Sequence, residues 1–260
     1  MKIYKAYAKV NIFLKVTGTR GNYHEIISRF MKVDNLYDEL SFVAKDSDEF
    51  KIIGEFSCAL EQNTIYKAYL ALKSATSSES LEKLMNSYAV EVKKSIPAFA
   101  GLGGGSSDAA TYLKMCNSVL DLGLSLNELA SIGLKVGADV PFFIYGYDSA
   151  NVSGIGEVVE KFDEELLNLE IKTPKIEIST PRVYTIYREN FFNPIDGFKT
   201  QELKKSKSID ILNSMGIGEV NDLFDPAIQE YKELKNHYTH GWYFSGSGSS
   251  FFRVKAKGEE

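Results

Sequence analysis

The chain contains little of what marks a disulfide-stabilised, metal-binding or nucleic-acid-binding protein. Its 260 residues include only two cysteines, Cys58 and Cys116, which form neither a disulfide framework nor a metal-ligand spacing. The 30 lysines and arginines are outnumbered by 35 aspartates and glutamates, so the formal net charge is −5. A nucleic acid or an anionic membrane needs a basic surface, and we expect neither partner. The net negative charge does not exclude a small anionic substrate, because a local basic site can lie in an acidic protein.

Long apolar runs are also missing. No segment approaches the roughly 20 apolar residues of a membrane span, and the first ten residues lack an apolar stretch of signal-peptide length. The content of 44% apolar and 25% charged residues is typical of a globular protein, and the length allows one large domain or two modest ones. We expect a cytoplasmic protein that is a monomer or a weak dimer.

The first half of the chain predicts strands followed by helices. Residues 3–16 alternate between apolar and polar side chains, which predicts a long strand with one buried face and with Lys9 and Asn11 on the other. Further strands are expected at 40–43, 50–56 and 88–93. Helices are expected at 64–73, with Asn63 as cap, at 107–119, and after the capping box formed by Ser125 and Glu128.

A second set of elements begins after about residue 154. The pattern predicts strands at 175–179, 242–244 and 251–254, and a helix that starts at Asp225 and Pro226. Strands and helices are mixed without regular alternation, so we expect an α+β protein with two lobes. We place the domain boundary after residue 158, which gives domains 1–158 and 159–260.

The glycine-rich segment after the predicted strand at 88–93 is the most informative one. Glycine N–H groups can approach an anion closely, and the start of the following helix adds unpaired N–H groups and a positive dipole end. A di- or triphosphate is the expected ligand. The candidate phosphate-binding residues are Pro97, Ala98, Gly101, Leu102, Gly103, Gly104, Gly105, Ser106 and Ser107.

Two common phosphate-binding motifs are excluded for this segment. No Gly-Lys-Ser/Thr follows, so it is not a Walker A loop, and Ser106 occupies the position of the last glycine in the dinucleotide fingerprint. The alternative is a flexible turn with a serine helix cap. Four glycines within five residues at a strand-to-helix junction favour phosphate binding.

The segment resembles the central motif of the kinases named for galactose, homoserine, mevalonate and phosphomevalonate. Segments 8–14 with 23–24, 137–143 and 244–251 resemble three further motifs in the same order, so the resemblance spans nearly the whole chain. It implies a two-lobe α+β kinase with its active site in the cleft between the lobes. The first domain would bind ATP as co-substrate with Mg²⁺, and the second would bind the acceptor.

The form Gly-Gly-Gly-Ser-Ser-Asp-Ala-Ala is most similar to one branch of that family. This resemblance implies phosphorylation of the 2-hydroxyl group of 4-diphosphocytidyl-2-C-methyl-D-erythritol, on the non-mevalonate route to isoprenoid precursors. The substrate partner would thus be a small molecule with a cytidine diphosphate group.

The resemblance also implies residue roles. Asp139 would be the general base and would contact the acceptor, while Lys9 would offset negative charge on the transferring phosphoryl group. The remaining residues would bind the acceptor: His24 at the cytosine edge with Tyr23 nearby, Tyr184 stacked on the base, and Asn11, Thr180 and Gly246 around it. No protein ligand of Mg²⁺ is assigned.

Each assignment has a structural alternative. Lys9 could be a solvated strand residue, His24 a surface residue, Tyr184 a core residue, Asp139 a turn cap, and segment 244–251 an ordinary hairpin turn. Two alternative functions also remain open: a kinase of the same fold with another alcohol acceptor, such as homoserine or mevalonate, and a nucleotide-binding protein without catalysis. Departures from the family pattern at Tyr7, Asn22 and Phe99 affect the paths of two loops.

Overall fold

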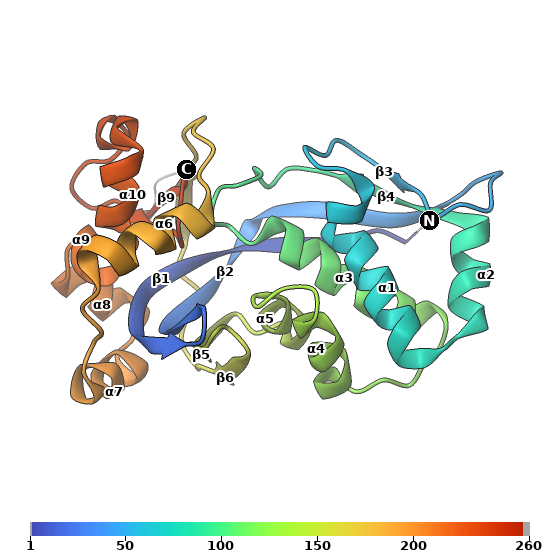
Figure 1. Cartoon of the computed structure of the whole chain (residues 1–260), viewed down its shortest axis with the longest axis horizontal. Coiled ribbons are helices and arrows are strands. Elements are labelled where there is room, and N and C mark those ends of the chain that lie inside the picture. Colours follow the sequence, from blue (N-terminus) through green and yellow to red (C-terminus); the bar gives the residue numbers. More distant parts are fainter. Residues whose placement is uncertain (1, 257–260) are drawn as a thin grey trace. The chain divides into compact units, whose positions relative to one another are not determined.

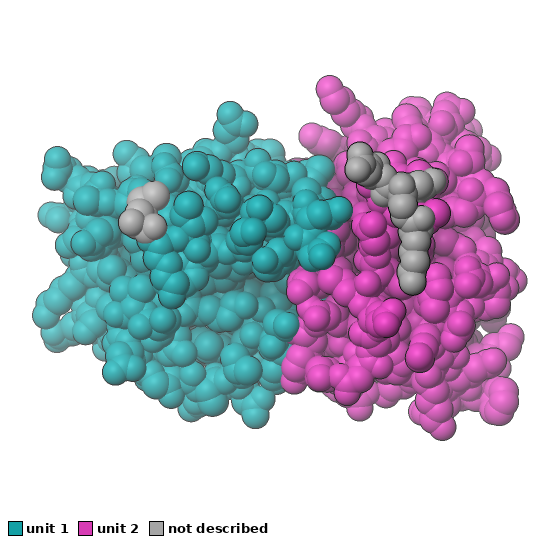
Figure 2. All heavy atoms as spheres, turned by 180° about the vertical axis from the view of Figure 1, so that it is seen from behind, with its two compact units in different colours: residues 1–8, 34–98, 103–146 teal, residues 9–33, 99–102, 147–260 magenta. Residues whose placement is uncertain are grey.

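The computed structural model describes residues 2–256 (Figure 1). The chain forms two compact units, which are coloured separately in Figure 2. Unit 1 comprises residues 1–8, 34–98 and 103–146, and unit 2 comprises residues 9–33, 99–102 and 147–260. The units interleave in sequence because the two longest strands, β1 (Tyr4–Arg20) and β2 (Tyr23–Ala44), contribute residues to both.

The units therefore follow no single boundary in the sequence. The predicted division after residue 158 concerned an ATP-binding and a substrate-binding domain, and in that functional sense it stays a prediction. Helices and sheets occur together in the chain, so the predicted α+β class is confirmed.

Unit 1 combines a small sheet with helices. Strand β4 (Tyr88–Lys93) pairs antiparallel with the end of β2, from Glu39↔Lys93 to Ala44↔Tyr88, and parallel with β3 (Ile52–Ile53). Helix α1 packs on α3, α3 on α5, and α4 on α5. The helices are η1 (Leu60–Gln62), α1 (Thr64–Thr76), α2 (Glu79–Ser87), α3 (Gly104–Val119), α4 (Leu126–Leu134) and α5 (Val140–Tyr145).

Unit 2 contains pairings in two sheets. The first part of β2 pairs antiparallel with β5 (Ser149–Gly154), from Ile26↔Gly154 to Met31↔Ser149, and β5 pairs with β6 (Val158–Lys161). A second, three-stranded sheet has the order β7 (Leu169–Lys172), β9 (Phe251–Val254), β8 (Tyr243–Phe244). The two strands predicted at 242–244 and 251–254 therefore exist and pair with each other.

Helices of unit 2 surround a core that is rich in aromatic side chains. They are α6 (Thr180–Ile186), the π-helical turn η2 (Tyr187–Phe191), α7 (Gly197–Lys205), α8 (Ser208–Ser214), α9 (Ile217–Val220), α10 (Phe224–Glu230) and η3 (Lys232–Asn236). Phe224, Phe244 and Phe251 are buried in one cluster with Val183 and Tyr187 of the α6–η2 segment. This cluster fixes α6, which carries the candidate site residues Thr180 and Tyr184, and the following turn η2.

Local sequence chemistry explains the helix starts that were predicted. The side chain of Asn63 accepts a hydrogen bond from the N–H of Ile65 at the start of α1, at 2.9 Å. Ser125 and Glu128 form the predicted capping box at the start of α4. Both caps satisfy backbone N–H groups that have no partner within the helix.

Four local expectations are corrected. Of the strand expected at 50–56, only β3 (Ile52–Ile53) forms. Strand β1 is buried on both faces from Ala8 to Leu14, because its polar side chains have partners inside unit 2. Residues 175–179 form no strand; Ile176 and Ile178 alternate because both pack into the aromatic core of unit 2. Helix α10 begins one residue before Asp225, because the chain already turns at Asn221, whose carbonyl accepts from the N–H of Phe224.

None of the helices between residues 2 and 256 is long and apolar enough to cross a membrane.

Candidate active site

The glycine-rich segment leads directly into helix α3 of unit 1. Gly103 has φ of 72° and occupies the cap position, and its carbonyl accepts the N–H of Ser107 at 2.9 Å. The first turn consists of Gly104, Gly105 and Ser106, whose N–H groups have no intrahelical acceptor by helix geometry. Together with the positive end of the helix dipole, this turn is suited to bind an anion.

Glycine is required at the bend of this segment. Gly101 has φ of 72°, and a Cβ atom at this position would lie 2.1 Å from the carbonyl oxygen of Ser245. A side chain there would displace the backbone of the C-terminal loop. Phe99, just before the bend, also has a positive φ of 53° and is 54% exposed, which is uncommon for an aromatic residue.

The bend of the segment lies against strand β1 in unit 2. The Lys9 N–H donates to the carbonyl of Leu102 at 3.0 Å, and the Lys9 ammonium group donates to the carbonyl of Gly101 at 2.9 Å. Lys9 is only 3% exposed. The alternative of a solvated strand lysine is therefore wrong, and the positive charge is held at the middle of the glycine-rich segment.

Asn11 extends this polar cluster along β1. Its Oδ1 atom accepts from the Lys9 ammonium group at 2.7 Å, and its Nδ2 atom donates to the Ser28 hydroxyl at 2.9 Å. Ser28 in turn donates to the carbonyl of Phe13. A Cβ atom at Gly246 would lie 3.3 Å from Asn11 Oδ1, so Gly246 also belongs to this cluster.

The loop Ser245–Ser250 connects the C-terminal strands to the glycine-rich segment. The Ser245 hydroxyl donates to the carbonyl of Gly101 at 3.0 Å, and the Ser250 N–H donates to the carbonyl of Ala100 at 3.1 Å. Buried Asn221 holds this loop through its Nδ2 atom, which donates to the carbonyls of Phe244 and Gly246. The loop is thus the turn of the β8–β9 hairpin, as the structural alternative has it, and it also contacts the glycine-rich segment.

His24 and Tyr184 lie together in unit 2. The His24 ring stacks on Tyr184 with a centroid distance of 5.0 Å and an interplanar angle of 26°, and the Tyr187 ring meets its edge at 5.8 Å. His24 is 8% exposed, and its Nε2 atom has no hydrogen-bond partner among the described residues. Burial, and then the charge of Arg188, lower the pKa of His24, so the imidazole is neutral near pH 7.

The neighbours of these rings differ in exposure. Tyr23 precedes His24 on β2, points away from the core and is 66% exposed. Thr180, at the start of α6, is exposed, and its hydroxyl lies 2.6 Å from the Ser247 hydroxyl. The segment with Thr180 and Tyr184 is thus tied to the C-terminal loop. A neutral imidazole with a buried, unpaired nitrogen beside aromatic rings is suited to a planar polar base.

Asp139 lies at the N-terminal end of α5 in unit 1. It occupies the cap position, but its side chain makes no capping hydrogen bond to α5, all of which lies among the described residues. Two residues earlier, a Cβ atom at Gly137 would lie 3.7 Å from the Ser106 hydroxyl. The segment that carries Asp139 thus packs beside the first turn of α3.

Several site-supporting residues were not predicted. Ser28 and Asn221 orient predicted residues by hydrogen bonds, and Tyr187 contacts His24. Lys94 pairs with Asp108 of α3, the helix that follows the glycine-rich segment, and also with Asp38 of β2. The available signals were weak: Ser28 and Asn221 are polar residues next to apolar ones, and nothing local to Asp38 or Lys94 predicts their partners.

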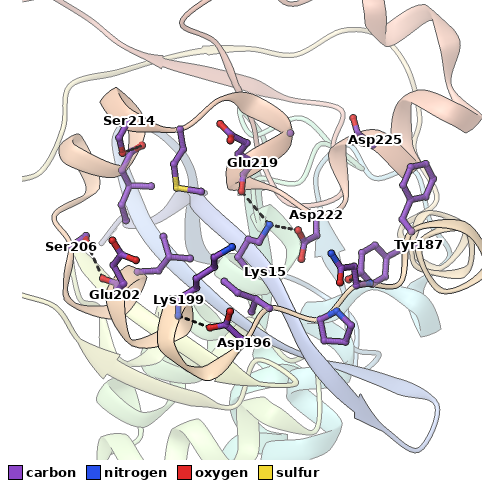
Figure 3. A pocket seen from close by; sticks show the side chains of 18 of the residues that line it. Lys15, Tyr187, Asp196, Lys199, Glu202, Ser206, Ser214, Glu219, Asp222 and Asp225 are labelled. Carbon is purple, nitrogen blue, oxygen red and sulfur yellow. Dashed lines mark hydrogen bonds and ion pairs between the residues drawn. The ribbon is translucent and has the colours of Figure 1, made fainter.

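Unit 2 also contains a cavity of about 730 Å³ (Figure 3). Its lining includes Lys15, which pairs with Asp222, and apolar residues of α7 and α8 such as Leu203 and Ile211. Tyr187 lines this cavity and also contacts His24. None of the residues predicted to bind ATP or acceptor lines it.

Comparisons with known proteins show the family to which the chain belongs. Residues 63–147 match the family described as "GHMP kinases N terminal domain". The chain is 70% identical to the 4-diphosphocytidyl-2-C-methyl-D-erythritol kinase of Sulfurimonas denitrificans, over 99% of this chain and 98% of that protein. It is 42% identical to the protein of the same name from Campylobacter jejuni subsp. jejuni, over 96% and 99% of the two chains.

Solved structures give the same result for the fold. The crystal structure of a 4-(cytidine 5'-diphospho)-2C-methyl-D-erythritol kinase matches with a TM-score of 0.74 and 28% identity, over 97% of this chain and 90% of that one. Homoserine kinase from Cytophaga hutchinsonii matches with a TM-score of 0.60 and 19% identity, over 98% and 87%. At that identity the second match concerns the fold alone.

Proposed function

Because the chain belongs to the family of 4-diphosphocytidyl-2-C-methyl-D-erythritol kinases, within the GHMP kinases, we propose that it phosphorylates that compound on its 2-hydroxyl group with ATP. The observation that carries the proposal is the 70% identity to a relative of that name over essentially the whole chain. The reaction belongs to the non-mevalonate route to isoprenoid precursors, and we propose a cytoplasmic location. We also propose that the chain is a monomer or a weak dimer.

We assign the ATP phosphates to the glycine-rich segment. The N–H groups of Gly104, Gly105 and Ser106 at the start of α3 offer donors to phosphate oxygens, and the helix dipole favours their charge. Pro97 and Ala98 form the exposed entry to this segment. Thr64 fixes the turn, because its hydroxyl donates to the carbonyl of Gly105 at 2.6 Å.

Mg²⁺ is proposed to accompany ATP and to neutralise charge on its phosphates. Among residues 2–256 no three His, Cys, Asp or Glu side chains are grouped closely enough to hold a metal ion. Phosphate oxygens and water would therefore supply most of its ligands, as is usual for this ion.

The chemical step needs a base and a cation. The 2-hydroxyl oxygen forms a bond to the γ-phosphorus, the bond from that phosphorus to the ADP oxygen breaks, and Asp139 takes the hydroxyl proton. Lys9 offsets negative charge on the transferring group, and Asn11 orients its ammonium group. Orienting two substrates can supply on the order of 7–11 kcal/mol, and a general base adds roughly 10²–10⁴-fold.

The cytidine group is assigned to the ring cluster of unit 2. Neutral His24 can both donate to and accept from the cytosine edge, and Tyr184 and Tyr23 offer stacking surfaces. Tyr184 stacks on His24 in this structure, so we propose that a base would stack on its outer face or replace that contact. Thr180 and Gly246 complete the acceptor site from α6 and the C-terminal loop.

Coupled ADP release with Mg-ATP tests this function directly. The acceptors are 4-diphosphocytidyl-2-C-methyl-D-erythritol, homoserine and mevalonate, each at the same concentration. Turnover with the cytidyl compound alone supports the proposal, and inhibition by CMP would support the base site. Turnover with another acceptor would replace the substrate assignment, and ATP binding without turnover on any acceptor would favour a non-catalytic nucleotide-binding protein.

A further inference from the structure

Three charged side chains connect the two ends of the glycine-rich segment inside unit 1. Asp38 belongs to β2, Lys94 directly follows β4, and Asp108 lies in the second turn of α3. Both carboxylates are almost completely buried, and the Lys94 side chain is largely buried between them. Buried charges are retained only with close partners, and each of these three has one.

Asp38 holds the chain where it enters the segment. Its Oδ1 atom accepts from the N–H groups of Ser95 and Ile96, at 2.5 and 2.8 Å. These two residues immediately precede Pro97, the first of the predicted phosphate-binding residues. Two charge-assisted hydrogen bonds to consecutive N–H groups fix the direction in which the backbone enters the segment.

Lys94 connects this entry to the exit of the segment. Its ammonium group donates to Asp38 Oδ2 at 2.5 Å and to Asp108 Oδ2 at 2.7 Å. Gly104, the first residue of α3, packs so tightly on Ile96 that a Cβ atom would lie 2.9 Å from the Ile96 side chain. The residues before Pro97 and after Gly103 are thus held together by side chains that are not themselves in the segment.

The charge of this cluster is not balanced, since one ammonium group serves two carboxylates. Asp108 Oδ1 is buried and has no hydrogen-bond partner among the described residues. Burial raises the pKa of Asp108 to about 7, although Lys94 opposes the shift. A neutral side chain of the same shape should therefore suit this position, provided that it still accepts a hydrogen bond from Lys94.

We propose that Asp38, Lys94 and Asp108 are positioning residues that preorganise the glycine-rich segment for the phosphates of ATP. Ordering a flexible backbone costs conformational entropy, so a segment whose ends are already fixed binds its ligand more tightly. The inference rests on the proposed function only in that the segment binds ATP.

The test compares two adjacent lysines. Lys94→Met removes the bridge, whereas Lys93→Met removes the exposed last residue of β4, whose ion pair with Glu39 is long at 4.0 Å. Asp108→Ala, Asp108→Asn and the double variant Lys94→Met/Asp108→Ala complete the set. For each protein the Mg-ATP Kd is measured by calorimetry, together with both KM values, kcat and the thermal midpoint.

We expect Lys94→Met and Asp108→Ala each to raise the Kd and KM for ATP roughly tenfold, the effect expected for one charge-assisted hydrogen bond. The acceptor KM should stay within about twofold, and the double variant should be no worse than either single one, because both remove the same link. Asp108→Asn and Lys93→Met should match the parent chain. If Lys94→Met does not fold, Lys94→Gln replaces it, and we expect a smaller rise in the Kd and KM for ATP.

An unchanged Kd for ATP with a lowered thermal midpoint would overturn the inference, because the cluster would then support only the fold. The inference would also be overturned if the increases in the Kd for ATP were additive in the double variant, or if Asp108→Asn bound ATP as weakly as Asp108→Ala. Failure of the proposed function is recognised separately: the parent chain would bind Mg-ATP but would not phosphorylate the cytidyl acceptor, and the ATP binding arm would still decide the inference.

Discussion

The ammonium group of Lys9 lies 2.9 Å from the carbonyl oxygen of Gly101, which is 92 residues away in the sequence. The same carbonyl accepts from the Ser245 hydroxyl, so strand β1, the glycine-rich segment and the C-terminal loop meet at one oxygen atom. Three of the four motifs that were identified in the sequence are thereby joined within unit 2.

Lys9→Met tests the role of this charge. We expect kcat to fall by about 10²–10³-fold, because the variant loses the positive donor that we propose for the transferring phosphoryl group. Lys5→Met, at an exposed position of the same strand, is the control and should keep the parent kcat. Steady-state kinetics measure both, and parent-like turnover of Lys9→Met would remove Lys9 from the chemistry.

Asp139→Asn tests the proposed general base. The amide keeps the shape of the side chain but cannot take the hydroxyl proton, so kcat should fall by at least about 10²-fold. The Kd for Mg-ATP should change little, because the phosphates are assigned to the start of α3. Calorimetry and single-turnover kinetics separate the two quantities; a variant with normal turnover, or one with lost ATP binding, is incompatible with this role.

The ring cluster of unit 2 predicts an effect on the acceptor alone. His24→Ala should raise the acceptor KM by roughly tenfold or more, since hydrogen bonds to the base are lost, while the KM for ATP stays constant. Tyr184→Ala should also raise the acceptor KM, whereas Tyr184→Phe keeps the stacking surface and should match the parent. Equal rises in both KM values would indicate a general disruption of the fold instead.

The pKa of His24 predicts a pH dependence of stability. Burial lowers this pKa in the folded chain, so the unfolded chain binds more protons below its ordinary value of about 6.5. The contribution of neutral His24 to the free energy of unfolding is therefore complete above about pH 6.5, and it declines as the pH falls toward the pKa of His24 in the folded chain. Between pH 7 and 5.5 the thermal midpoint of the parent should fall more than that of His24→Gln, which has no imidazole to protonate. An equal fall in the two midpoints would contradict this reasoning.

Asn221→Ala tests the support of the C-terminal loop. The buried amide donates to the carbonyls of Phe244 and Gly246 and accepts from the N–H of Leu223. Its loss leaves these groups unsatisfied, so the free energy of unfolding should fall by roughly 2–4 kcal/mol. Asn213→Ala, on an exposed position of α8, should stay within about 0.5 kcal/mol of the parent in the same denaturant titration.

Much of the site could be predicted from the sequence because its motifs are local. The strand-to-helix junction at Gly103 follows from glycine and helix-start chemistry, and the resemblance to the GHMP kinases is confirmed by the full-length relatives. The burial of Lys9 and Asn11 could not be predicted from alternation, since their partners, the carbonyl of Gly101 and the hydroxyl of Ser28, are distant in sequence.

Other features depended on long-range packing. The alternation at 175–179 reflects burial of Ile176 and Ile178 without strand pairing, and a period of two cannot distinguish the two cases. The interleaving of the two units results from long strands that contribute to both, which no local composition change reveals. Asp38, Lys94 and Asp108 come from three separate elements, so their cluster is visible only in the folded chain.

The most direct test of the central claim is to identify the phosphorylated product. The chain is incubated with Mg-ATP and 4-diphosphocytidyl-2-C-methyl-D-erythritol, and phosphorus NMR and mass spectrometry locate the transferred group. We predict one new phosphomonoester on the 2-hydroxyl group, an intact cytidine diphosphate group, and one ADP for each product molecule. Release of inorganic phosphate without a new ester, or an ester at another hydroxyl group, would contradict the proposed function.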